Sequence, residues 1–387
     1  MENKKIVFLT NSLAAGGAEK VISVLLSELV KQKYKIELIC LEQNNFYEIP
    51  KEVKLTYLTN FNGKEKGIKK ILFIPILAWK LKKYIKNTEI IQIQSHVYRS
   101  NYINILAKIF GSKHNVQIVN TGTISKYYNE GLVGKINLFL IKFLYPKANL
   151  IITKSKGMLL DMQSLYNFKN EIIVLNNPYD IEKIKKLKNE IVDDFNFKSD
   201  KKYIISVGRF EIFKQQDYII ETLTKLSNEY ELILLGDGYK KNYLQALSNK
   251  LNVQDRVHFL GRVLNPYKYM AKSDLYILSS NNGEGFPNVL IEAMICNLPI
   301  ISSDCKSGPR EILAPETDTN IQIQSGIEEA KYGILVPIGN IKSLVNAIIL
   351  MENNTIKNKY VSNAKKRMKD FEVNIIVDKY KKVLNVK

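Results

Sequence analysis

The sequence is poor in the residues that build disulfide frameworks and metal centres. Its 387 residues include only three cysteines, Cys40, Cys296 and Cys305, and only three histidines. The cysteine spacing fits neither a disulfide scaffold nor a zinc site. No Ser-His-Asp set, Cys-His pair or cluster of metal ligands emerges from the sequence. We therefore expect a reduced, cytoplasmic setting and a metal-independent chemistry that rests on positioning and electrostatics.

Long hydrophobic runs are also missing. The longest candidate is residues 71–79, nine apolar residues that include Pro75, which are too few to cross about 30 Å of hydrocarbon. The chain begins with a predicted strand and does not resemble a cleavable secretory signal. With 45% hydrophobic and 25% charged residues, 10 prolines and 19 glycines, a disordered or collagen-like chain is excluded. We expect a globular protein that does not span a membrane.

Acidic residues are outnumbered, with 38 against 57 basic ones, of which only six are arginine. This lysine bias is typical of an AT-rich genome, so the total charge alone says little about partners. Its distribution is more informative, because residues 51–150 hold 17 basic and 4 acidic side chains. That excess favours an anionic partner, either a membrane surface, a pyrophosphate lipid or nucleic acid.

One stretch of this basic region combines lysines with apolar residues. Residues 67–86 contain six lysines around an apolar run with Trp79, a pattern typical of a helix at a membrane interface. Pro75 would break or start that helix, and residues 138–145 are a second candidate. The alternative is a core helix with solvated lysines. Nucleic acid is disfavoured, because the run lacks interleaved stacking aromatics.

Strands and helices alternate along the whole chain. Buried strands are predicted at residues 5–10, 35–41, 90–94, 116–120 and 150–153, and again at 203–207, 231–235, 257–260, 275–279 and 299–303. Between them lies a charged connector, residues 180–202. The alternation predicts an α/β fold with two Rossmann-like domains and a cleft between them, lined by loops at the carboxyl ends of the strands. The last helix, over 373–384, is expected to return to the first domain.

Two glutamates flank the predicted start of a helix after residues 275–279. They belong to the segment Asn282-Gly283-Glu284-Gly285-Phe286-Pro287-Asn288-Val289, which continues to Glu292. Proline suits the first helical turn, and backbone N–H groups at a helix start bind anions. Glu284 would accept hydrogen bonds from sugar hydroxyls, and Glu292 from a vicinal diol such as ribose. The alternative is a pair of solvated glutamates.

Basic and glycine residues follow other predicted strands. Arg209 and Lys214 come after residues 203–207 and would offer two positive charges to a pyrophosphate. Gly16 and Gly17 follow the first strand and permit close approach of a phosphate or an acceptor. Each has a simpler alternative, a solvated surface charge for the basic residues and a ligand-free tight turn for the glycines.

These motifs together resemble family 4 retaining glycosyltransferases of the GT-B fold. The wording E-G-F-P-N-V-L-I-E-A from Glu284 is similar to the family's E-x7-E signature, and Gly208-Arg209-Phe210 with Lys214 is similar to its G-R-F-x-x-x-K segment. Residues 11–17, 236–238, 259–263, 307–311 and 332–337 also match the family's order. The resemblance implies an acceptor-binding domain over 1–180, a nucleotide-sugar-binding domain over 181–370, and a helix over 371–387 that packs toward the first domain.

The resemblance also implies site residues, residue by residue. Those that would carry the catalysis are Glu284, Arg209 and Lys214. The implied donor-binding residues are Gly208, Arg209, Lys214, Gly236, Arg262, Val263, Glu284, Gly285, Phe286, Pro287, Asn288, Val289 and Glu292. The acceptor-side residues are Gly16, Gly17, Thr121, Gly122 and Thr123. In a retaining transfer of this kind, the leaving diphosphate itself would take the acceptor proton.

The sequence departs from the family's pattern at one position. Many relatives carry a histidine after a strand of the first domain, where this chain reads Val119-Asn120-Thr121-Gly122-Thr123. Its role would pass to the backbone or to the two threonines. His114 is expected on a surface turn, His258 in a structural role, and His96 in a structural role or lining the acceptor side. Asp193 and Asp194 lie in the connector rather than after a core strand.

Within the family, the sequence resembles most the α-1,4-N-acetylgalactosaminyltransferases that extend undecaprenyl-diphosphate-linked oligosaccharides in bacterial protein glycosylation. This resemblance rests on the sequence segments 144–148, 265–272 and 306–308. It implies transfer of a hexose or N-acetylhexosamine, best GalNAc, from a UDP-sugar to a polyprenyl-diphosphate-linked glycan on the inner face of the cell membrane. Alternatives are a capsule or O-antigen enzyme with another donor, a GT-B-like epimerase or phosphorylase, and a sugar-binding protein. Residues 316–331 look like an extra loop without an assigned function.

Overall fold

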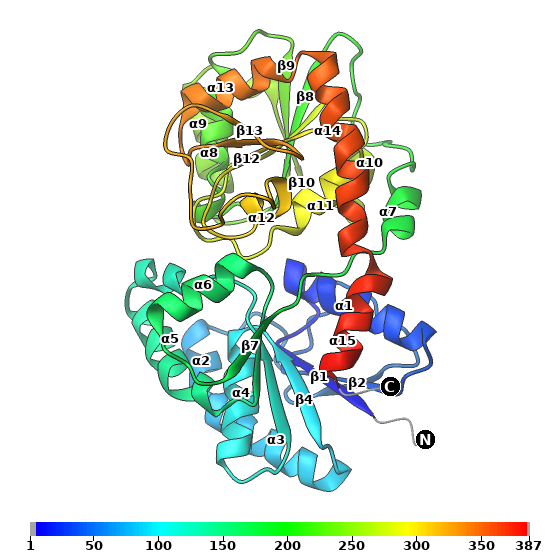
Figure 1. The fold of residues 1–387 in the computed structure, drawn as a ribbon, viewed down its shortest axis with the longest axis vertical. Helices are drawn as coiled ribbons and strands as arrows, with labels where there is room; N and C mark the ends of the chain where they lie inside the picture. Colours follow the sequence, from blue (N-terminus) through cyan, green and yellow to red (C-terminus); the bar gives the residue numbers. More distant parts are fainter. Residues whose placement is uncertain (1–4, 385–387) are drawn as a thin grey trace. The chain divides into compact units, whose positions relative to one another are not determined.

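A computed structural model describes residues 5–384 of the chain. It divides into two compact units (Figure 1), one formed by Met1–Tyr179 with Phe371–Lys387 and the other by Asp180–Asp370. Each unit has its own seven-stranded sheet and its own hydrophobic core. The expected α/β class with two doubly wound halves is confirmed.

The sheet of the first unit is parallel throughout, in the order β3-β2-β1-β4-β5-β6-β7. Strands β1 and β6 are short, buried and mainly aliphatic, as expected for strands covered on both faces. Strand β4 is also buried but carries the polar residues Gln94, Ser95 and His96. The two edge strands are more exposed. The strands are β1 (Ile6–Thr10), β2 (Ile36–Cys40), β3 (Lys54–Tyr57), β4 (Gln92–His96), β5 (Asn115–Val119), β6 (Leu150–Thr153) and β7 (Glu171–Val174).

Helices cover both faces of this sheet. On one face α1 and α15 pack on Phe8, Leu38 and Ile152, and on the other α3, α4 and α5 pack on Leu9, Ile39 and neighbouring residues. The helices are α1 (Gly17–Lys31), α2 (Gly67–Leu72), α3 (Ile74–Thr88), α4 (Tyr98–Ile109), α5 (Gly131–Leu144), α6 (Lys156–Leu165) and α15 (Val373–Val383), with 3-10 turns η1 (Ser125–Asn129) and η2 (Tyr145–Lys147).

The sheet of the second unit has the order β10-β9-β8-β11-β12-β14-β13, and only β13 runs antiparallel to its neighbour. Parallel strands place their carboxyl ends, and the loops that follow them, at one edge of the sheet. The strands are β8 (Lys202–Val207), β9 (Tyr230–Leu235), β10 (Val257–Gly261), β11 (Leu275–Leu278), β12 (Ile300–Ser303), β13 (Glu328–Glu329) and β14 (Ile334–Val336).

The second core joins this sheet to α8, α9 and α13 through Ile219, Leu244, Leu344 and the buried strand residues. Its helices are α7 (Ile181–Leu187), α8 (Gln216–Leu223), α9 (Lys241–Lys250), α10 (Tyr267–Met270), α11 (Asn288–Ile295), α12 (Pro309–Leu313), α13 (Ile341–Leu350) and α14 (Asn354–Arg367). Three 3-10 turns complete the chain: η3 (Ile212–Lys214), η4 (Gln254–Arg256) and η5 (Met368–Phe371).

The chain returns to the first unit at its carboxyl end. After α14 it pairs with Tyr179, whose N–H donates to Phe371 O at 3.0 Å and whose O accepts from Val373 N at 2.9 Å. Helix α15 then lies against α1 (Figure 1), with Ile376, Val377 and Tyr380 in the first core. This helix therefore belongs to the first unit.

Several local expectations need correction. Strand β4 is Gln92–His96 rather than 90–94, and the connector over 180–202 includes helix α7. Pro75 starts α3, which resolves the choice between breaking and starting a helix. Pro287 is the residue before α11, not part of its first turn. His114, expected on a surface turn, is buried, with Nε2 2.8 Å from Asn104 Oδ1.

Candidate active site

The implied catalytic side chains lie on loops after β8 and β11, which are neighbours in the second sheet. Lys214 ends the turn η3, and Glu284 lies in the loop between β11 and α11. Lys214 Nζ is 2.5 Å from Glu284 Oε1, and Ser280 Oγ donates to the same oxygen at 2.5 Å. Glu284 is 7% exposed. The two loops thus present a nearly buried ion pair at the carboxyl edge of the sheet.

Backbone contacts fix these two loops to each other. Asn281 N donates to Phe213 O at 2.8 Å, and Ser279 Oγ donates to Lys214 O at 2.7 Å. A Cβ on Gly283 would lie 3.0 Å from the Phe213 ring. These contacts fix the backbone of the two loops, and the bond from Lys214 Nζ to Glu284 Oε1 holds the ammonium.

Arg209 has a different environment from Lys214. Its side chain is 58% exposed, and its Nη1 is 2.7 Å from Glu211 Oε1. Its carbonyl oxygen accepts from Gln216 Nε2 at 3.1 Å, which fixes the backbone but not the guanidinium. Lys214 instead lies beside Gly208, where a Cβ would be 3.6 Å from Cε. The structure therefore brings together Gly208, Lys214 and Glu284, while Arg209 projects into solvent.

Glycines allow the strand ends of β8, β9 and β10 to come close. Gly236 has a φ of +146°, and a Cβ there would be 1.9 Å from Gly208 O. Its N–H donates to Gly261 O at 2.7 Å, and Phe210 N donates to Asp237 O at 3.0 Å. Beyond Gly261, Arg262 is exposed and Val263 is half-buried. Residue 236 must be glycine for the segment with Gly208 and Arg209 to sit where it does.

The start of α11 packs against the loop after β12. Ser307 Oγ donates to Gly285 O at 2.6 Å, and a Cβ on Gly308 would be 2.3 Å from Pro287 Cδ. Phe286 and Pro287 are buried, whereas Asn288 and Val289, the first two residues of α11, are half-buried. The helix start is therefore fixed by residues 307–311, Ser-Gly-Pro-Arg-Glu, which is one of the segments that match the family's order.

Glu292, expected to hold ribose, is 3% exposed on α11 and makes contacts within the chain. Its negative charge and that of Glu284 both affect the buried phenol of Tyr276. Burial raises the pKa of Tyr276 well above its ordinary value, and the negative charges of Glu284 and Glu292 add to that rise. The two glutamates of the E-x7-E pattern thus share one electrostatic neighbourhood.

The implied acceptor-side residues lie at the carboxyl edge of the first sheet. Gly16 precedes α1, Gly17 begins it, and a Cβ on Gly16 would be 2.2 Å from Glu19 Oε2. After β5, Asn120 Nδ2 donates to Gly122 O at 2.8 Å, while Thr121 is half-buried and Thr123 is buried. All five residues follow β1 or β5, separated in the sheet by β4.

Two further titratable side chains near this edge are buried. His96, the last residue of β4, has its Nε2 3.1 Å from Gln94 Oε1. Burial lowers the pKa of His96 well below its usual range, and the charge of Lys154 lowers it further. Burial alone lowers the pKa of Lys154 to about 7, and its ammonium contacts the hydroxyl of Tyr380 on α15.

The third histidine, His258, lies in the second sheet, where its Nε2 is 2.7 Å from Glu231 Oε2.

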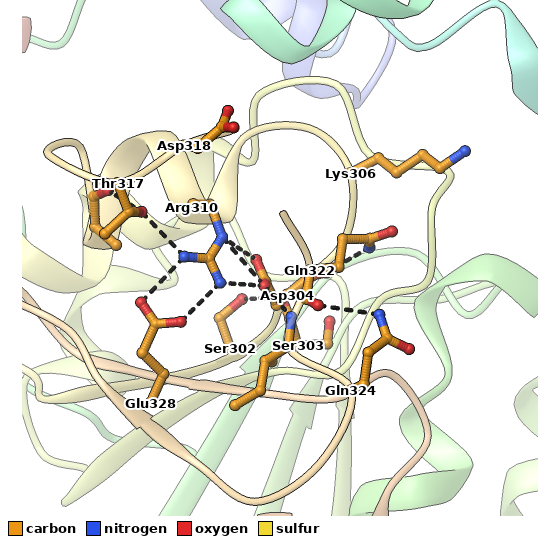
Figure 2. Close-up of polar contacts among 12 residues, drawn as sticks. Ser302, Ser303, Asp304, Lys306, Arg310, Thr317, Asp318, Gln322, Gln324 and Glu328 are labelled. Carbon is orange, nitrogen blue, oxygen red and sulfur yellow. Dashed lines mark hydrogen bonds and ion pairs between the residues drawn. The ribbon is translucent and has the colours of Figure 1, made fainter. Parts of the chain in front are cut away.

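Sequence reasoning missed the side chains that support the site. Ser280 binds Glu284, and Gln322 binds Asn282 of the same loop. Figure 2 shows a further network in which Arg310 binds Asp304, Thr317 and Glu328. The segment 307–311 contained Arg310 but gave no partner for it. In the part of the chain that the structure describes, residues 5–384, no group of three or more His, Cys, Asp or Glu side chains could hold a metal ion.

The same described residues hold no helix that is both long and apolar enough to cross a membrane.

Known proteins match both halves of the chain. Residues 188–368 match the family described as Glycosyl transferases group 1, and residues 15–183 match Glycosyltransferase Family 4. A Campylobacter jejuni protein, N-acetylgalactosamine-N,N'-diacetylbacillosaminyl-diphospho-undecaprenol 4-alpha-N-acetylgalactosaminyltransferase, is 34% identical over 372 residues, covering 95% of this chain and 96% of the relative. A second C. jejuni α-1,4-N-acetyl-D-galactosaminyltransferase, acting on a GalNAc-containing diNAcBac-PP-undecaprenol, is 26% identical over 98% of each chain.

Solved structures show the same fold. Anabaena HepE in complex with UDP and glucose has a TM-score of 0.75 at 19% identity, covering 99% of this chain and 100% of that one. Sucrose-phosphate synthase from Thermosynechococcus elongatus has a TM-score of 0.82 at 16% identity, covering 99% and 98%. The chain has the GT-B fold, and it belongs to the family 4 glycosyltransferases.

Proposed function

We propose that the protein transfers an N-acetylhexosamine, best GalNAc, from a UDP-sugar to a polyprenyl-diphosphate-linked glycan, with retention of the anomeric configuration. The observation that carries this proposal is the Lys214–Glu284 pair at the carboxyl edge of the second sheet, in a chain whose relatives act on undecaprenol-linked glycans. An acceptor hydroxyl would bond to the anomeric carbon as the bond to UDP breaks. The acceptor proton would pass to the leaving diphosphate.

The second unit would bind the donor. Lys214 and Arg209 would stabilise the diphosphate as its charge develops, and Glu284 would accept hydrogen bonds from the transferred sugar. Glu292 would accept from ribose hydroxyls. The remaining donor residues that we propose are Gly208, Gly236, Arg262, Val263, Gly285, Phe286, Pro287, Asn288 and Val289. Lys214 is already paired with Glu284, so a sugar and a diphosphate would be bound by two side chains that orient each other.

The two cations also bear on metal use. Arg209 and Lys214 supply positive charge where the leaving group forms, which is the role that a divalent ion has in other transferases. We therefore propose that the transfer needs no metal cofactor and continues in excess EDTA.

The first unit would bind the acceptor near Gly16, Gly17, Thr121, Gly122 and Thr123. Exposed apolar side chains on two of its helical segments suit an anionic membrane surface, which is where a lipid-linked acceptor is found. On α5, Leu132, Phe139 and Phe143 are exposed beside Lys135 and Lys142. Along α2 and α3 the exposed apolar residues are Ile68, Leu72, Ile76 and Trp79. Such combinations bind interfaces by burying apolar area and by attraction to anionic lipids.

The experiment is a donor panel of UDP-GalNAc, UDP-GlcNAc, UDP-galactose and UDP-glucose against a lipid-linked glycan, with and without EDTA. We expect UDP to be released only when donor and acceptor are both present. A phosphorylase would require free phosphate, and an epimerase would convert the donor without an acceptor. Preference for a hexose over UDP-GalNAc would favour a capsule or O-antigen role.

A further inference from the structure

The extra loop of residues 316–331 is closed at both ends by one arginine. Arg310 in α12 is buried, and its Nη1 donates to Thr317 Oγ1 and Glu328 Oε1, both at 3.0 Å. Its Nη2 donates to Glu328 Oε2 at 2.8 Å and to Asp304 Oδ2 at 2.5 Å. Figure 2 shows the guanidinium between these groups. The loop is therefore attached to the end of β12 and does not hang free.

The middle of the loop reaches the residues that precede Glu284. Ile323 N donates to Asp304 Oδ2 at 2.8 Å. The Gln322 amide donates from Nε2 to Asp304 O at 2.6 Å and to Asn282 Oδ1 at 3.0 Å. Asn282 Oδ1 also accepts from Lys306 N at 2.9 Å. Asn282 is thus bound by Gln322 and Lys306, whereas the N–H of Asn281 donates to Phe213 O.

These contacts hold the Glu284 loop through two other segments of the chain. Lys214 and the Phe213 carbonyl bind Glu284 and Asn281, and Gln322 and Lys306 N bind Asn282. The loop also has bonds of its own, from Ser280 Oγ to Glu284 Oε1 at 2.5 Å and from Gly283 N to Asn281 O at 2.8 Å, and Ser307 Oγ binds Gly285 O beyond Glu284. Among these contacts, those of Gln322 and Lys306 N are the ones that hold the Asn282 side chain.

We propose that residues 316–331 brace the Glu284 loop, with Gln322 as the positioning residue, and that this brace sets how the transferred sugar is held. The inference rests on the proposed function, because that function assigns the binding of the transferred sugar to Glu284. Small displacements of a group that contacts the reacting part of a substrate reduce the rate strongly. Binding of UDP alone, which has no sugar for Glu284, should not depend on the brace.

The test compares Gln322→Ala with Ser325→Ala, an exposed residue of the same loop. We expect Gln322→Ala to lower kcat by about three- to tenfold, less than the full loss of two neutral hydrogen bonds would give, because Lys306 N still binds Asn282. The variant should also narrow the kcat/KM preference between UDP-GalNAc and UDP-GlcNAc. UDP affinity by calorimetry should be unchanged. Asn282→Ala should have the same effects, and the double variant with Gln322→Ala should be no worse than either single one. Asn282→Asp keeps the acceptor oxygen and should therefore retain most of the kcat of the unmodified chain.

A second measurement does not need the transfer reaction. Amide hydrogen exchange over residues 281–286 should be faster in Gln322→Ala than in Ser325→Ala or the unmodified chain. If the enzyme is active but hydrogen exchange and donor preference are the same in all three proteins, the proposal that Gln322 positions the Glu284 loop is wrong. If the unmodified chain shows no transfer, the proposed function fails, and exchange alone still decides whether Gln322 positions the loop.

Discussion

The ion pair of Lys214 with Glu284 is largely buried, whereas the ion pair of Arg209 with Glu211 is exposed on the arginine side. The side chains of Lys214 and Glu284 are 15% and 9% exposed, and that of Arg209 is 58% exposed. Removing one partner of a buried pair leaves a charge without compensation, while an exposed pair adds little to stability. The two cations that we assign to the diphosphate should therefore differ in what they do for the fold.

Replacing each cation with alanine separates these roles. Lys214→Ala should lower the free energy of unfolding of the second unit by roughly 3–5 kcal/mol as well as depress turnover. Arg209→Ala should change stability by less than about 0.5 kcal/mol and weaken UDP binding by about 1.5–3 kcal/mol. Denaturant unfolding and calorimetry measure both quantities. Wild-type turnover in both variants, with an intact fold, would refute the assignment.

Lys154 gives the first unit a pH dependence with a defined sign. The ordinary pKa of a lysine is 10.5, and burial lowers that of Lys154 to about 7 in the fold. Between these values the unfolded chain holds a proton that the folded chain has lost. The free energy of unfolding should therefore rise with pH from about 7 toward 10.5.

Urea unfolding of the intact chain across this pH range, followed by a probe in the first unit, tests the prediction. Lys154→Met removes the titrating group while keeping an apolar chain against Tyr380. The variant should show a flatter dependence between pH 7 and 10. An equal slope in both proteins would show that Lys154 does not titrate in this window.

At the scale of elements, the site depends on how closely strand-end loops approach one another. Gly236→Ala would place a Cβ 1.9 Å from Gly208 O and would require a φ of +146° that alanine avoids. We expect the Gly208–Arg209 segment to shift and UDP affinity to fall, with the global fold retained. Gly67→Ala is a matched control, because a Cβ there meets nothing within 4 Å. Unchanged UDP affinity in Gly236→Ala would contradict the role of this turn.

The sequence predicted the strands that are continuous apolar runs, whereas it missed β3 and β7 and misplaced β4 by two residues. Buried strands such as β8 and β9 are continuous apolar runs, so their positions and the loops after them could be read directly. Strands β3 and β7 lie at the sheet edges, and their exposed ends give no such pattern. The start of α3 depended on whether Pro75 breaks a helix or begins one.

The supports of the site could not be predicted for a different reason. Gln322 and Asn282 are 40 positions apart, and Arg310 and Glu328 are 18 apart. Neither pair has a periodicity that would signal contact. The burial of His114 could not be predicted for the same reason, because its hydrogen-bond partner Asn104 lies on another element, α4. Local patterns indicate elements, whereas these partnerships arise only from packing.

For the whole molecule, the proposed membrane surface predicts binding to anionic vesicles at low salt and release at high salt. Phe139→Asp with Phe143→Asp should abolish most of this binding, because both side chains are exposed on α5. Ile191→Asp is a suitable control, since Ile191 is 83% exposed in the second unit. Vesicle sedimentation measures the effect. Equal binding to neutral and anionic vesicles, or no binding at low salt, would overturn the proposed surface.

The central claim is that the protein transfers a sugar from a UDP donor to a lipid-linked glycan with retention. The most direct test is to incubate it with UDP-GalNAc and a polyprenyl-diphosphate-linked glycan, and to determine the linkage in the isolated product by NMR. The account predicts a single added sugar in an α linkage, formed together with one UDP. A β-linked product, or a glycan that remains unextended by every donor in the panel, would contradict it.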